Sequence, residues 1–252
     1  MKNLLDLTGK TALVTGGRRG IGLALVEGLA GAGATVAVAA RGKEGGELAS
    51  RMSACGAEWE YFPTDLSCRK QRQALVPAVV KRFGRLDILV NCAGIQHRQP
   101  SMEFSLEKWD EIISLMLTAV FELSQQAARV MDKQGGGKIV NIGSISCFQG
   151  GWTVPAYTAA KHGVAGLTKA LANEWAAKNI NVNCIAPGYF DTEMCAAIKA
   201  DPGREAKIRD RIPAGRWGAV DELVGPLLFL ASDASRYVHG VVLSVDGGWM
   251  GR

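Results

Sequence analysis

Short apolar runs alternate with segments of helical periodicity along the chain, and this alternation constrains the fold more than any other feature. Residues 11–15 form a compact apolar run, after which Ile21, Leu25 and Leu29 recur at helical spacing, and a second apolar run at 35–39 restarts the cycle. Strands separated by helices can pair in parallel with both faces covered, so they are apolar throughout. The pattern predicts an α/β fold, a doubly wound parallel sheet with helices on both faces.

The alternation continues to the end of the chain. Further strands are expected at 58–62, 86–90, 138–142, 180–185 and 241–245, about seven in all, and further helices up to Cys55 and at 67–83, 105–132, 155–178 and 220–231. No linker, repeat or low-complexity segment interrupts 1–252, so we expect a single domain. The segment 188–215 lacks a strand signal and is rich in charge, glycine and proline, and it is expected to form a mobile substrate lid.

Charge and hydropathy exclude several classes of function. The chain carries 29 Lys and Arg against 24 Asp and Glu, a formal net charge of +5, but these residues are scattered and form no basic stripe. Proteins that bind nucleic acid or membrane surfaces normally show such a stripe, so neither partner is expected. No apolar stretch approaches the roughly 18 residues of a membrane span, and the N-terminus lacks the apolar core of a signal peptide. We expect a cytoplasmic protein that binds a small molecule.

The cysteines and histidines give no sign of a metal site or a disulfide framework. Both kinds of site depend on regular spacings. The six cysteines contain no C-x-x-C pair, and His97, His162 and His239 are isolated from one another. We therefore expect free, buried thiols in a reducing compartment and no bound metal.

A glycine-rich turn joins the first strand to the first helix, where residues 15–22 read TGGRRGIG. Glycines let the backbone approach a pyrophosphate closely, and the N-terminus of the helix offers free N–H groups and a partial positive charge to the anion. Such a turn at the first strand–helix junction is typical of dinucleotide-binding proteins. The cofactor contacts expected in this turn are Gly16, Arg18, Arg19, Gly20, Ile21 and Gly22.

The end of the second strand favours NADP over NAD. Folds that bind NAD usually place an acidic residue there to bind the ribose hydroxyls, whereas this chain has Arg41 after two alanines. Arg41, Arg18 and Arg19 would surround a 2′-phosphate, a ligand suited to the bidentate geometry of arginine. The alternative is that these arginines contact only solvent, in which case NAD would be the cofactor. Further cofactor contacts are expected after the third and fourth strands, namely Asp65 (to the adenine amino group), Leu66, Asn91, Ala93 and Gly94.

Three side chains predict the chemistry. Tyr157 and Lys161 lie one turn apart on one face of an expected helix, and Ser144 follows a strand at the carboxyl edge of the sheet. A free tyrosine has a pKa of about 10, so a base of this type needs a nearby cation such as Lys161 to favour the phenolate. Tyr157 would exchange a proton with a carbonyl or hydroxyl oxygen while Ser144 hydrogen-bonds the same oxygen. This set predicts hydride transfer between a nicotinamide and a secondary alcohol or ketone.

Together these motifs resemble those of the short-chain dehydrogenase/reductase family. The resemblance runs from Lys10 to the C-terminus and rests on the glycine turn, residues 91–94, the set Ser144, Tyr157 and Lys161, and Pro187-Gly188 with Thr192. It implies a Rossmann-type domain and a homotetramer. It also implies cofactor contacts from Tyr157, Lys161 (to the ribose), Pro187, Gly188 and Thr192.

Several segments resemble one branch of that family more closely. Residues 148–151, 173–175, 211–218 and 245–249 are similar to those of family members that act on sugar acids. The resemblance implies a sugar-acid substrate such as a deoxygluconate or a gluconate, which needs a cationic partner. The candidate substrate contacts are Ser144, His97 (followed by Arg98), Trp152 and Tyr189.

Three positions depart from the family pattern. Met116 stands where the family has a helical asparagine that supports a proton relay to the lysine, although the backbone carbonyl at 116 would still hold a water. Trp152 and Thr153 occupy the place of an arginine of the sugar-acid enzymes, and Cys92 replaces an asparagine. Two alternatives therefore stay open: a carbonyl reductase for a less polar ketone, and a nucleotide-binding protein with weakened catalysis.

Overall fold

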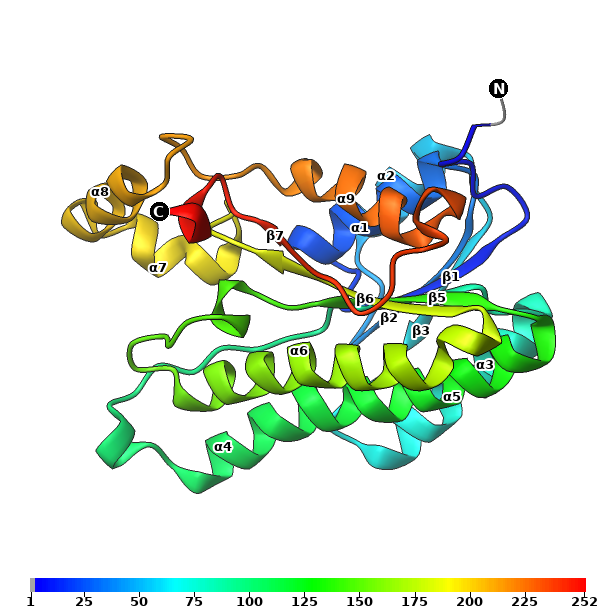
Figure 1. Ribbon diagram of the computed structural model, residues 1–252, viewed down its shortest axis with the longest axis horizontal. Coiled ribbons are helices and arrows are strands. Elements are labelled where there is room, and N and C mark those ends of the chain that lie inside the picture. The colour runs from blue at the N-terminus through cyan, green and yellow to red at the C-terminus, as the bar shows by residue number, and fades with distance from the viewer. Residues whose placement is uncertain (1–2) are drawn as a thin grey trace.

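The computed structural model describes residues 3–252 and is built around one seven-stranded parallel sheet (Figure 1). The strands are β1 (Thr11–Thr15), β2 (Thr35–Ala40), β3 (Trp59–Pro63), β4 (Ile88–Asn91), β5 (Gly137–Ile142), β6 (Ile180–Pro187) and β7 (Val242–Val245). Their order is β3-β2-β1-β4-β5-β6-β7, and every neighbouring pair is parallel. The chain therefore winds outward from β1 in one direction and from β4 in the other.

Helices cover both faces of the sheet (Figure 1). One face carries α1 (Gly20–Gly31), α2 (Gly46–Cys55) and α9 (Val224–Ala231), and the other carries α3 (Arg69–Phe83), α4 (Leu106–Ile113), α5 (Ala119–Gln134) and α6 (Pro155–Trp175). Two shorter helices, α7 (Ala196–Lys199) and α8 (Pro202–Arg211), follow the carboxyl end of β6. Single 3₁₀ turns lie at Ser101–Glu103, Ile145–Cys147, Ala176–Lys178, Glu193–Cys195, Val220–Leu223, Asp233–Ser235 and Trp249–Gly251. Among residues 3–252, none of the helices could span a membrane.

The strands supply apolar side chains to two separate cores. Val14 and Val38 are completely buried against Leu25 on the α1 side, and Leu13 and Leu89 are completely buried on the side of α3 and α5. Successive side chains of a strand point to opposite faces, so both sets are apolar because both faces are covered. Each such side chain contributes about 1.5–3 kcal/mol on burial. This packing explains why the strands read as continuous apolar runs.

The predicted fold class is confirmed, and each predicted strand lies within two residues of the observed bounds. One predicted element differs in detail. The expected helix 105–132 is α4 and α5 joined by a π-helical turn, Ser114–Thr118, whose wider hydrogen-bonding pattern apolar periodicity does not reveal. The segment 188–215 contains no strand, as predicted, but it holds the short helices α7 and α8.

The topology places the loops that carry the predicted motifs at one edge of the sheet. Because all seven strands are parallel, the loops after β1, β4, β5 and β6 share that edge. Open parallel sheets bind ligands at the point where the winding direction reverses, which here lies between β1 and β4. The glycine turn follows β1 at that point.

Candidate active site

The glycine turn between β1 and α1 forms a narrow cradle. Gly16 has a φ of +72°, and a Cβ there would lie 2.8 Å from the Cα of Ala93. A Cβ on Gly22 would overlap the carbonyl oxygen of Gly16. Both positions therefore require glycine. Arg19 precedes α1 without a side-chain cap, which leaves the first N–H groups of the helix available to an anion.

The two arginines of the turn diverge. The Arg18 guanidinium donates to the carbonyl oxygen of Lys43 at 3.0 Å, in the loop after β2 that also holds Arg41. The Arg19 guanidinium pairs instead with Glu193 at 2.8 Å, in the segment after β6. The structure thus brings Arg18 to the end of β2, where the sequence predicts the 2′-phosphate, and directs Arg19 toward the 188–215 segment.

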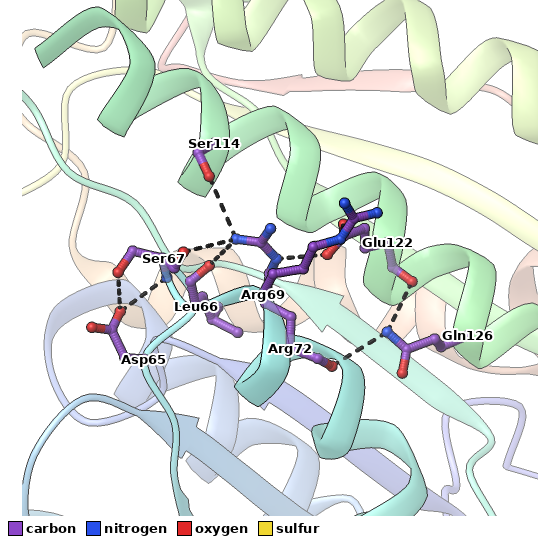
Figure 2. A network of polar contacts seen from close by, with 8 residues as sticks. All are labelled: Asp65, Leu66, Ser67, Arg69, Arg72, Ser114, Glu122 and Gln126. Carbon is purple, nitrogen blue, oxygen red and sulfur yellow. Dashed lines mark hydrogen bonds and ion pairs between the residues drawn. The ribbon is translucent and has the colours of Figure 1, made fainter. Parts of the chain in front are cut away.

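The loop after β3 is shaped by Asp65 (Figure 2). Its Oδ1 accepts hydrogen bonds from the backbone N–H of Ser67 at 2.9 Å and from the Ser67 hydroxyl at 2.8 Å. These bonds lower the pKa of the Asp65 carboxyl, because they stabilise the charged form. Leu66, between the two, is buried.

A buried guanidinium ties that loop to the helical layer (Figure 2). Arg72 on α3 donates to the carbonyl oxygen of Leu66 and to a carboxylate oxygen of Glu122 on α5, both at 2.6 Å. A longer bond of 3.4 Å reaches the hydroxyl of Ser114, where the π-helical turn begins. Gln126 donates in turn to the carbonyl oxygen of Arg72 at 3.3 Å. The network fixes the Asp65 loop relative to α5.

Arg72→Met is expected to lower the free energy of unfolding by about 3 kcal/mol, because it removes the buried partner of a largely desolvated carboxylate. The side chains of Arg72 and Glu122 are 4% and 14% exposed. Arg69 contacts the same carboxylate at 3.0 Å but is 73% exposed, so Arg69→Met, the matched control, should cost less than about 1 kcal/mol. Denaturant unfolding measures both losses, and equal losses would contradict the role given to burial.

The end of β4 lies against the glycine turn. The hydroxyl of Thr15 accepts hydrogen bonds from the backbone N–H groups of residues 92–93 at 3.1 and 3.2 Å. Asn91 is buried, and its amide donates to Asn141 on β5 at 2.9 Å. The Asn91 side chain therefore links strands of the sheet, which leaves the backbone from Ala93 to Gly94 beside the cradle.

Ser144, Tyr157 and Lys161 come from two elements that pack together, the turn after β5 and helix α6. Ser144 follows β5, and its hydroxyl accepts a backbone N–H at 3.1 Å from the turn Ile145–Cys147. The Lys161 Nζ lies 5.6 Å from the centroid of the Tyr157 ring and donates to the carbonyl oxygen of Ile142 at 2.6 Å. Lys161 is only 6% exposed. The end of β5 thus holds a buried cation beside the phenol ring of Tyr157.

The residues that follow β6 form a further part of the candidate site. Gly188 follows Pro187 and packs so closely on the β7 end that a Cβ would lie 2.7 Å from the Cα of Asp246. Thr192 follows in extended conformation, directly before the turn Glu193–Cys195. These residues lie where the sequence predicts the nicotinamide contacts.

The segment after β6 is anchored by aromatic packing. The Tyr189 ring packs against Trp217 and Trp249, with centroids 5.3 and 4.8 Å away. Burial raises the pKa of the Tyr189 hydroxyl. Phe190 and Gly218 form a parallel bridge, which ties the two ends of the segment between them to each other.

Two arginines that lie close to each other and to Tyr189, Arg98 and Arg204, have no carboxylate partner among residues 3–252. Arg98, in the loop after β4, makes only a long hydrogen bond of 3.4 Å to the carbonyl oxygen of Trp152, and Arg204 lies on α8. Burial and then the charge of Arg204 lower the pKa of Arg98, while the hydroxyls of Tyr189 and Tyr157 act in the opposite direction. Two neighbouring cations repel each other, and an anion between them would relieve the repulsion.

Of the other predicted substrate contacts, His97 is half-buried and Trp152 is exposed. The His97 ring lies 3.1 Å from the Gln99 amide oxygen and packs edge-on against Phe104 at 5.5 Å. The side chain of Trp152 is 81% exposed. Arg98 is the residue of this loop whose charge interacts with the Tyr157 hydroxyl.

Comparisons with known proteins identify the family of this chain. A family model described as enoyl-(acyl carrier protein) reductase matches residues 16–250. A 2-dehydro-3-deoxy-D-gluconate 5-dehydrogenase of Dickeya dadantii (strain 3937) is 48% identical over 251 residues, which cover 99% of each chain. The chain belongs to the short-chain dehydrogenase/reductase family. It is therefore an oxidoreductase.

Two further relatives of this short-chain dehydrogenase/reductase bear related names. Gluconate 5-dehydrogenase of Gluconobacter oxydans (strain 621H) is 44% identical, over 98% of this chain and 96% of that protein. The crystal structure of a gluconate 5-dehydrogenase from Burkholderia cenocepacia J2315, in complex with NADP and tartrate, has a TM-score of 0.94 at 40% identity, over 99% of this chain and 98% of that chain.

Met116, at the position of the family asparagine, lies in the π-helical turn and is 1% exposed. Its side chain packs in an apolar cluster with Ile112 and Ala160, against which Tyr157 also packs. The Met116 methyl group lies 3.3 Å from the place that a Cβ on Gly94 would take. An amide at this position would therefore be surrounded by apolar groups.

Met116→Asn is expected to lower the free energy of unfolding by about 2 kcal/mol, because it buries an amide without a partner and loses apolar contact. No gain in turnover is expected, since the space around the side chain is apolar. Met116→Leu, which keeps the apolar volume, should cost less than about 1.5 kcal/mol. Thermal unfolding and steady-state rates test both variants; a tenfold rise in turnover for Met116→Asn would show that the proton relay needs the amide.

Sequence reasoning missed two groups that the structure places at this site. One is Arg204, whose position beside Arg98 depends on how the segment after β6 folds back. The other is the carbonyl oxygen of Ile142, which holds Lys161. Only the many charged residues of α8 pointed toward Arg204 in the sequence. A sequence does not indicate which backbone carbonyl will bind a given lysine.

Proposed function

We propose that this enzyme interconverts a secondary alcohol and a ketone on a sugar acid, such as a deoxygluconate or a gluconate, with NADP(H). The observation that carries the substrate class is the pair of neighbouring cations Arg98 and Arg204, which have no carboxylate partner among residues 3–252 and of which Arg98 interacts with the Tyr157 hydroxyl. Guanidinium groups bind carboxylates through charge-assisted, often bidentate, hydrogen bonds. The names of the relatives support this substrate class.

The residues present fit a dinucleotide phosphate. The cradle at Gly16 and Gly22 excludes even a Cβ, and the uncapped N-terminus of α1 offers N–H donors. Arg18 and Arg41 lie at the end of β2, where a 2′-phosphate would bind, and the Burkholderia relative was crystallised with NADP. The residues proposed to hold the cofactor are Gly16, Arg18, Arg19, Gly20, Ile21, Gly22, Arg41, Asp65, Leu66, Asn91, Ala93, Gly94, Tyr157, Lys161, Pro187, Gly188 and Thr192. NAD remains the alternative cofactor.

Ser144, Tyr157 and Lys161 account for the proton chemistry. The bound nicotinamide would supply hydride to the substrate carbon or accept it from that carbon. During reduction, the Tyr157 hydroxyl donates its proton to the carbonyl oxygen, and the Ser144 hydroxyl donates a hydrogen bond to the same oxygen. Lys161, held by the carbonyl oxygen of Ile142, offsets the negative charge left on Tyr157. During oxidation, Tyr157 takes the proton from the alcohol.

The chain would act as one domain with a closing segment. Residues 188–215 follow β6 and include α8 with Arg204, so their movement would carry that cation toward Arg98. The bridge between Phe190 and Gly218 fixes the base of the segment, so the residues between them would move as one flap. The ion pair of Arg19 with Glu193 links the segment to the glycine turn.

We also propose a homotetramer. Phe121 on α5 and Leu106 on α4 are 41% and 73% exposed, and an open groove between α3 and α5 is lined by Val76, Pro77 and Val80. Exposed apolar surface of this kind is typical of subunit contacts. Light scattering on the purified protein should give four times the mass of the chain.

A substrate panel tests the proposed function. NADPH and NADH consumption would be measured with keto sugar acids, with neutral sugars of the same chain length, and with less polar ketones. Turnover of keto sugar acids with NADPH at a kcat/KM at least tenfold above the neutral sugars is expected. A preference for less polar ketones would favour the carbonyl reductase, and tight NADPH binding without any turnover would contradict an enzymatic function.

A further inference from the structure

Two buried cysteines meet beneath the turn that carries Ser144. Cys147 ends the 3₁₀ turn Ile145–Cys147, and Cys184 lies in the middle of β6, where it pairs with β5 and β7. Both side chains belong to one apolar cluster, with exposures of 6% and 0%. All six cysteines of the chain are free thiols, but the prediction that they are buried holds only for Cys147 and Cys184, since Cys55 is exposed and the other three are half-buried.

The two sulfurs approach the same point of the backbone. A Cβ on Gly143 would lie 2.7 Å from the Sγ of Cys147 and 2.7 Å from the Sγ of Cys184. Glycine at 143 is what allows both thiols to occupy this space. A disulfide needs Cβ atoms about 3.5–4.5 Å apart and sulfurs about 2.05 Å apart. The two thiols share one contact point and are joined by a hydrogen bond, so they face each other with no other side chain between them and would have to move closer to form the bond.

The electrostatic surroundings make the two thiols unequal. A hydrogen bond from Cys184 is the main cause that lowers the pKa of Cys147, and the charge of Lys161 also contributes. The same hydrogen bond and burial raise the pKa of Cys184 well above its usual value. A thiolate is the nucleophile toward oxidants, whereas the remaining protonated thiol resolves the product. The pair therefore has one attacking sulfur and one resolving sulfur.

We propose that Cys147 and Cys184 form an oxidative modification site, at which a peroxide produces a reversible disulfide that switches the enzyme off. The Cys147 thiolate attacks the peroxide O–O bond and becomes a sulfenic acid, with hydroxide as the leaving group. The Cys184 sulfur then displaces water from that sulfenic acid, so two thiols and one H₂O₂ give one disulfide and two H₂O. A dithiol reductant returns both thiols.

The bond would act on the site through two contacts of Cys147. Its backbone N–H donates to the carbonyl oxygen of Ser144 at 2.8 Å, and its thiol donates to the carbonyl oxygen of Lys161 at 3.1 Å. Disulfide formation removes the second contact and pulls the turn toward β6. A displacement of about 1 Å at a reacting group can cost about a hundredfold in rate.

The test uses the full chain treated with hydrogen peroxide, then alkylated and mapped by mass spectrometry. We expect a peptide pair linked through Cys147 and Cys184, a turnover about a hundredfold lower, and recovery with dithiothreitol. Cys184→Ala and, separately, Cys147→Ala should retain activity under peroxide, and circular dichroism before treatment confirms their folding. The disulfide is mapped without substrate, so a wrong substrate class would not affect this result.

Cys195→Ser and Cys55→Ser are the matched controls. Cys195 lies near Arg98 and Tyr189 in the segment after β6, and Cys55 is exposed at the end of α2. Both control variants should lose activity under peroxide as the parent does. Protection by Cys195→Ser, or the absence of the linked peptide pair, would overturn the proposal, as would a disulfide that leaves turnover unchanged.

Discussion

Tyr157→Phe is expected to lower turnover about a thousandfold while leaving the affinity for NADPH within about twofold of the parent value. The change removes only the hydroxyl, so the ring still packs against the apolar cluster around Met116. Proton transfer to the substrate oxygen then has to come from water. The Ser144 hydroxyl and Lys161 stay in place, because their own contacts do not involve the Tyr157 hydroxyl. Steady-state rates and NADPH fluorescence titration measure the two quantities.

Tyr237→Phe is the matched control for that experiment. The Tyr237 side chain is fully exposed and lies in the loop between α9 and β7, so its substitution should leave both rate and affinity unchanged. A Tyr157→Phe rate within tenfold of the parent would mean that another group delivers the proton. Loss of NADPH binding in that variant would mean that the hydroxyl serves the cofactor more than the substrate.

Local pattern was enough to predict the strands and to single out three side chains that the structure brings into neighbouring elements. The runs at 11–15 and 35–39 are mostly apolar because helices cover each strand on both faces, so the burial of these strands can be recognised from the sequence alone. Ser144 and Tyr157 could be placed because parallel topology brings the carboxyl ends of strands to one edge. These predictions need no knowledge of contacts between distant segments.

The features that escaped prediction depend on distant contacts or on backbone detail. Arg18 and Arg19 are adjacent in sequence, yet Arg18 bonds to the loop after β2 and Arg19 to Glu193, 174 positions later. The π-helical turn at Ser114–Thr118 changes hydrogen bonding without changing the apolar pattern around it. The approach of Arg204 to Arg98 follows from the path of the chain after β6, which composition does not fix.

Arg98→Met is expected to lower kcat/KM for a sugar acid about a hundredfold, mainly through KM, and to leave a neutral sugar of the same length within about threefold. Methionine keeps most of the side-chain volume and removes the charge. The substrate carboxylate would then keep only Arg204, on the segment after β6. Parallel kinetics with the acid and the neutral compound separate loss of carboxylate binding from a general disturbance of the site, which would affect both substrates equally.

Arg204→Met and the double variant decide whether both cations hold one carboxylate. Arg204 lies on the segment proposed to close over the site. Arg204→Met alone should therefore lower kcat/KM about tenfold. Two cations that share one anion are coupled, and the double variant should then lose less than the product of the single losses. Arg209→Met, which removes another arginine of α8 that pairs with Glu205 at 3.6 Å, is the control and should leave kcat/KM unchanged. Fully multiplicative losses would show that Arg98 and Arg204 bind different groups, and no loss at Arg98 would place the carboxylate elsewhere.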